Sequence, residues 1–137
     1  MTDRQSRSMK TTAAILAAAL GGCSSLPAGE RVWMLAHAVD VAQTVQIARS
    51  DCFWEDDPVT SRLIGEHAST GEAIAWGVAW GGLHYGVTRM LEAWESPRWL
   101  QAGWQVLTIA NTAHVVKQNT DQGLDPWGAD CPPARAR

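Results

Sequence analysis

Six polar side chains on three predicted helices are the best candidates for chemistry: His37, Asp40, Thr44, His84, Asn111 and His114. The first three lie within about 60° of one another at about 100° per helical residue, so they share one helix face. His84 repeats at a four-residue spacing after Trp76 and Trp80 on the second helix. If the three helices turn these faces inward, the six side chains meet in one pocket.

Imidazole and carboxylate groups in one pocket suit zinc, iron or manganese. The sequence contains no dedicated metal motif such as H-E-x-x-H, and buried polar groups are usually paired with one another. We therefore predict a hydrogen-bonded network with no bound metal and no cofactor, under an apolar lid formed by Trp80 and Trp104. A ligand-binding or metal-binding module that uses the same six residues is the alternative.

Enzymatic and nucleic-acid-binding functions have little support in the sequence. No G-x-S-x-G nucleophile motif occurs, and Gly81-Gly82 sits within a predicted helix, not in a phosphate-binding loop after a strand. The formal net charge of −3 and the pI near 5.7 give no basic face for nucleic acid. We expect a protein that is not an enzyme, has no catalytic residues and has no nucleic-acid partner.

Hydrophobic periodicity predicts three helices, over 31–50, 70–94 and 97–120, and therefore an all-α three-helix bundle. Ser69 and Glu72 have the spacing of a capping box before the second helix. Ser96 and Pro97 predict the start of the third helix, with Ser96 as its cap, and Gly123 predicts its end. A short helical turn is expected within 58–65, and no strand pattern of useful length appears.

The first 23 residues have the layout of an export signal. Basic residues within 1–10 precede an uncharged stretch over 11–20, which is short for a membrane span. The segment ends at Leu20-Gly21-Gly22-Cys23, which resembles the lipobox of bacterial lipoproteins. That resemblance implies cleavage before Cys23, a diacylglycerol on its thiol and an acyl chain such as palmitate on the new amino terminus. An ordinary signal peptide or a first membrane helix is the alternative.

The chain is long enough for one domain, and we divide it accordingly. We assign 1–22 to the signal peptide, 23–30 to the lipidated cysteine and a tether, 31–122 to the helical domain and 123–137 to an irregular tail. Ser24 replaces the Asp that often retains such lipoproteins in the inner membrane, which favours the outer membrane. We expect a periplasm-facing protein, held to the membrane by its lipid, with a structural or protein-interaction role toward an envelope partner.

A small membrane-embedded helical protein is a second interpretation. Residues 73–88 and 100–116 carry no formal charge, although polar side chains within the helices would be costly in hydrocarbon. In addition, Asp40-x3-Thr44 followed by Glu55-x-Asp57-Pro58 is similar to a D-x3-T and E-x-N-P pattern of small uncharacterised bacterial membrane proteins with three helices. That family brings no known activity to this chain.

Two further cysteines remain once Cys23 is acylated. Cys52 follows the first predicted helix, and Cys131 lies in the C-terminal tail. Exported proteins form disulfides in oxidising compartments, so we expect these two residues to pair. Two free thiols are the alternative if the body lies in the membrane.

Overall fold

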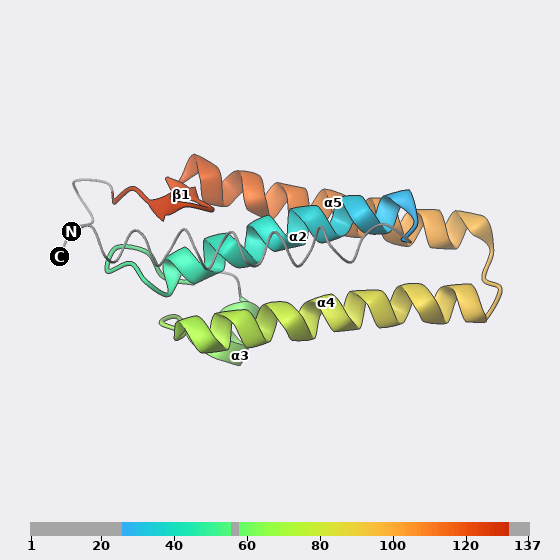
Figure 1. Cartoon of the computed structure of the whole chain (residues 1–137), viewed down its shortest axis with the longest axis horizontal. Coiled ribbons are helices and arrows are strands. Elements are labelled where there is room, and N and C mark those ends of the chain that lie inside the picture. The colour runs from blue at the N-terminus through green and yellow to red at the C-terminus, as the bar shows by residue number, and fades with distance from the viewer. Residues whose placement is uncertain (1–25, 56–57, 132–137) are drawn as a thin grey trace.

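The computed structural model describes residues 26–55 and 58–131, and this part of the chain is mostly helical, which confirms the all-α class (Figure 1). Its elements are α2 (Ala28–Ile47), α3 (Thr60–Ile64), α4 (Thr70–Ala93), α5 (Arg98–Asp121), β1 (Leu124–Asp125) and β2 (Gly128–Ala129). Cys23 and Asp57 lie outside the described residues. Across the described ranges, no helix is both long enough and apolar enough to cross a membrane.

Helix α2 is the centre of the fold. It packs against both α4 and α5, whereas those two helices contact each other far less (Figure 1). The contact with α4 is tight at Gly77, where an added Cβ would lie 2.5 Å from a methyl group of Val41. Only glycine therefore allows the two helices to approach each other at this point.

Two helix ends match the predicted capping signals. Ser69 and Glu72 form the capping box at the start of α4, with Glu72 Oε2 accepting from the Ser69 N–H at 2.7 Å. Gly123 follows α5 with a φ of +93°, a left-handed conformation that favours glycine and ends the helix.

Two other helix starts differ from the prediction. The N-cap of α5 is Pro97 and no side chain caps it, so the proposed cap by Ser96 is wrong. Helix α2 begins at Ala28, three residues before the predicted 31, and shortens the expected tether of 23–30. The reason is that Glu30 is buried against the other helices, so the first turn has tertiary contacts that the sequence does not reveal.

The C-terminal segment was expected to be irregular but is partly ordered. β1 and β2 pair as a two-residue antiparallel hairpin, with Leu124 opposite Ala129. The side chain of Gln43, fully buried on α2, holds this segment in place: its Nε2 donates to the carbonyl of Leu124 at 2.9 Å and to Thr120 Oγ1 at 3.0 Å. The hairpin is too short to leave a strand pattern in the sequence.

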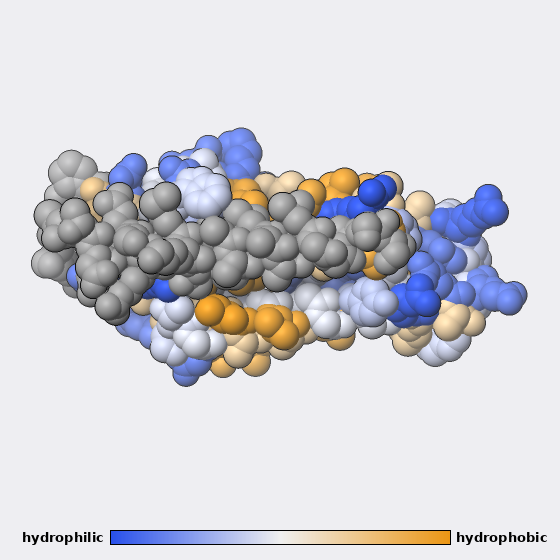
Figure 2. Space-filling model, viewed as in Figure 1, coloured by the Kyte–Doolittle hydropathy of each residue, from blue (hydrophilic) through white to orange (hydrophobic). Residues whose placement is uncertain are grey.

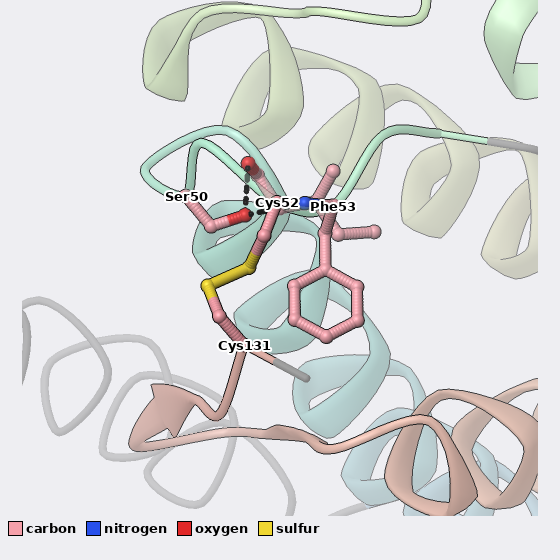
Figure 3. Close-up of a disulfide and its surroundings, with 5 residues drawn as sticks. Ser50, Cys52, Phe53 and Cys131 are labelled. Atoms are coloured by element: carbon pink, nitrogen blue, oxygen red, sulfur yellow. Dashed lines mark hydrogen bonds between the residues drawn. A yellow bond between two sulfur atoms is a disulfide. The ribbon is translucent and has the colours of Figure 1, made fainter. Parts of the chain in front are cut away.

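The structure joins Cys52 and Cys131 in a disulfide, as expected (Figure 3). Their Cα atoms are 5.8 Å apart, within the usual range for a disulfide. Cys52 is buried in a small apolar cluster with Ile47, Phe53 and Leu124. The bond therefore attaches the C-terminal hairpin to the end of α2.

Breaking this disulfide should destabilise the fold. The two cysteines are 79 residues apart, and closing a loop of that size is worth about 4 kcal/mol in the chain-entropy model. We expect Cys52→Ser to lower the free energy of unfolding by about that amount, measured by urea denaturation. Reductant should destabilise the wild type but have no further effect on Cys52→Ser; an equal effect on both proteins would contradict the prediction.

Candidate functional site

Four aromatic rings from three helices form a stacked column inside the molecule. Trp33 of α2 lies between His37 and His84, with ring centroids 4.7 Å and 3.5 Å away, and its plane is nearly parallel to both. Trp104 of α5 continues the column at 5.2 Å from His84. Trp33 and His84 are only 2% and 3% exposed. The column therefore links α2, α4 and α5 through their side chains.

A buried carboxylate lies beside the end of this column. Glu30 is 1% exposed, and its Oε2 accepts from Gln105 Nε2 at 2.9 Å and from Thr88 Oγ1 at 3.2 Å. The indole N–H of Trp104 donates to Thr88 Oγ1 at 3.1 Å. His84 Nε2 is 3.6 Å from Glu30 Oε2. Donors from α4 and α5 thus converge on one oxygen of this carboxylate of α2, whereas its other oxygen, Oε1, is buried without a hydrogen-bond partner.

Burial disfavours the charged form of the two histidines of the column. Desolvation lowers the pKa of His37 below its usual 6.5, and a hydrogen bond with the Gly77 carbonyl opposes part of this shift. The pKa of His84 is also lowered by desolvation, against the opposing charge of Glu30. His37 Nε2 lies 2.9 Å from the Gly77 oxygen, so in the neutral ring this nitrogen carries the proton and donates it.

A groove opens next to His37, between α2, α4 and α5. It encloses about 590 Å³, and four of the six predicted residues line it: His37, Asp40, Thr44 and Asn111. Trp76 and Trp80, also in its lining, stack on each other with centroids 5.8 Å apart. Concave sites with aromatic walls and a few polar groups are typical of small-molecule binding.

The six predicted residues do not meet in one pocket. His84 belongs to the ring column and does not line the groove. His114 is exposed on α5 and contacts neither feature, so its assignment to the cluster is wrong. The reason is the rotation of α5: Thr112 is its buried residue, and a position two residues later points about 200° away around the helix.

The most important polar contacts were not predicted. The sequence pattern places Glu30 in the tether and does not indicate that Thr88 and Gln105 belong to a site. The sequence does contain one pattern that places Glu30 near the ring column. Glu30, Trp33 and His37 are spaced three and four residues apart and therefore lie on one helix face. His84 and Thr88 are likewise four residues apart on α4.

The ring column and the groove have different chemical capacities. The column connects the three helices by ring stacking, with hydrogen bonds from His37 and Trp104, whereas the groove is open and has polar groups for a ligand. In the described part of the chain, no three His, Cys, Asp or Glu residues are grouped so that they could hold a metal ion. No protein-family model, curated protein or solved structure matches this chain.

The two column histidines should make the fold sensitive to acid. Their folded pKa values lie below the unfolded value of about 6.5, so the unfolded chain binds more protons in mild acid. The contribution of these two histidines to the free energy of unfolding should be fully present above about pH 6.5. It should fall as the pH drops toward the folded pKa values. We expect His37→Gln combined with His84→Phe to reduce this slope, measured as urea-unfolding free energy against pH.

These substitutions are chosen to preserve the contacts of the column. The glutamine amide can still donate to the Gly77 carbonyl, and the phenylalanine ring can still stack on Trp33. His114→Gln, which removes an exposed histidine outside the column, is the control and should leave the slope as in the wild type. An unchanged slope in the double variant would show that the buried rings are not responsible.

Proposed function

We propose that this chain is an envelope-anchored lipoprotein with a structural or protein-interaction role. In this proposal, 1–22 is a signal peptide, and the acylated Cys23 holds a three-helix bundle of α2, α4 and α5 on the periplasmic side of a membrane. Ser24 favours the outer membrane. The protein acts by contact with an envelope partner and not by catalysis.

The disulfide supports the export part of the proposal. Disulfides persist in oxidising compartments such as the periplasm and are rare in the cytosol. Cys52 and Cys131 are paired between the end of α2 and the C-terminal hairpin, and Cys52 is buried. Of the three cysteines, this leaves Cys23 alone with its thiol available for a lipid.

The observation that carries the interaction role is the orientation of α4. Its buried residues are small or polar: Ala73, Gly77, His84 and Thr88. Its large apolar side chains instead face outward, with Val78, Leu83 and Tyr85 exposed by 71%, 55% and 47%. A helix of a free-standing domain normally has the opposite arrangement, with its apolar stripe against the core.

Helix α5 repeats this arrangement. Thr112 is its buried residue, whereas Val106 and Leu107 are each 68% exposed. Figure 2 shows hydrophobic surface along both α4 and α5 on the viewed face. Extended apolar patches on a protein surface mark sites of interaction with other proteins or with membranes. We propose that a protein partner covers the side of α4 that exposes Val78 and Tyr85, which lie about two helical turns apart.

Lipid attachment can be tested on the tagged full chain in a bacterial host. We expect metabolic labelling with a palmitate analogue to mark the wild type and Ser24→Ala, but not Cys23→Ser. Globomycin, which blocks the lipoprotein signal peptidase, should cause the unprocessed precursor to accumulate. Normal processing in the presence of globomycin, together with an unlabelled wild type, would show that the chain is not a lipoprotein.

The interaction face can be tested by site-specific photocrosslinking in cells. A photoreactive residue at Tyr85 should give one adduct of defined mass, whereas one at Lys117, an exposed position on the polar end of α5, should not. Val78→Glu should abolish the Tyr85 adduct, because Val78 lies about two turns away on the same side of α4 and a charge would then lie in the contact. An adduct from Tyr85 that survives Val78→Glu, or no adduct at all, would contradict the proposed face.

A further inference from the structure

The turn between α4 and α5 forms one end of the molecule and projects beyond the start of α2 (Figure 1). It exposes four large apolar side chains, with exposed fractions between 39% and 74%: Met90, Trp94, Trp99 and Leu100. We call these four side chains the tip. The hydrogen bonds that connect α4 and α5 to Glu30 of α2 come from Thr88 and Gln105, so none of the four tip side chains takes part in them.

The composition of the tip matches that of a membrane–water interface. Tryptophan has a large apolar body and one polar N–H, and is enriched where proteins meet lipid headgroups. Arg89 and Arg98 flank the tip and are exposed, with positive charges suited to lipid phosphates. Arg89 is paired with Glu92, and Glu95 lies exposed in the turn, so the two arginines and two glutamates of 89–98 give no net charge and the apolar side chains carry the argument.

The position of the anchor places this end of the molecule at the bilayer. Ala28, the first residue of α2, is the fifth residue after Cys23. At no more than about 3.6 Å per residue, that link spans at most about 18 Å. Pro27 and Gly29 line the same cavity, of about 330 Å³, as Leu91 and Arg98. A lipid on Cys23 is therefore tethered beside the tip.

We infer that the tip inserts its apolar side chains into the surface of the lipid bilayer that holds Cys23. This inference rests on the proposed acylation of that residue. The lipid and the tip together give two attachment points, which fix the orientation of the body in addition to its distance from the membrane. The hairpin end, with Trp127 and the disulfide, lies at the other end of the long axis (Figure 1).

Depth-dependent quenching of tryptophan fluorescence tests this contact. The probe is the full acylated chain, reconstituted in phosphatidylethanolamine and phosphatidylglycerol vesicles with brominated acyl chains. We expect bromine to quench the wild type, and the combination of Trp94→Phe and Trp99→Phe to lose most of that quenching. Trp127→Phe is the matched control: Trp127 is 53% exposed but lies at the far end, so the quenching should persist.

The outcomes separate this inference from the proposed function. If palmitate labels the wild type but the double variant is quenched as strongly as the wild type, the tip does not enter the bilayer and the lipoprotein proposal stands. If palmitate does not label the wild type, the lipoprotein proposal fails and the positional argument for the tip fails with it. Near-ultraviolet circular dichroism and thermal unfolding should show that both variants keep the wild-type fold.

Discussion

The arrangement of the helices depends on one buried carboxylate. Glu30 is almost completely removed from water, and an unpaired charge in that position would cost several kcal/mol. Donors from Gln105 on α5 and Thr88 on α4 offset this cost, and both reach the same oxygen. Because α4 and α5 contact each other less than either contacts α2, the carboxylate of α2 is a main connection between them, beside the direct contacts of Trp104 with Thr88 and His84. The ring column through Trp33 continues the same linkage along the inside of the molecule.

This polar interior determines what remains outside. The inward side of α4 must be small at Gly77, where Val41 approaches, and polar at Thr88, where the carboxylate needs a donor. The large apolar residues of that helix are therefore left on its outer side. Such a distribution is unfavourable for a helical body alone in water, because apolar surface gains free energy when it leaves water. A contact with another molecule would relieve that cost, and this is the physical basis of the proposed interaction role.

The two ends of the molecule have different physical roles. At one end, the disulfide, the hairpin and Gln43 attach the C-terminal segment to α2, so this end is held by a covalent bond and by buried hydrogen bonds. At the other end, α4 and α5 extend past the start of α2 and leave two tryptophans exposed. The covalently attached end and the end with exposed tryptophans therefore lie at opposite ends of the long axis.

The sequence by itself determined the features that depend on neighbouring residues. The periods of the helices, the capping box at Ser69 and the terminating glycine at 123 follow from local chemistry, and the pairing of the two remaining cysteines follows from their number once Cys23 is set aside. Only the tertiary structure decided which side of each helix faces inward. Mixed small, polar and apolar residues occur all around α4 and α5, so no single apolar stripe identifies the core. For that reason His114 was assigned to a site that it faces away from, and Glu30, on which the packing depends, was assigned to a tether.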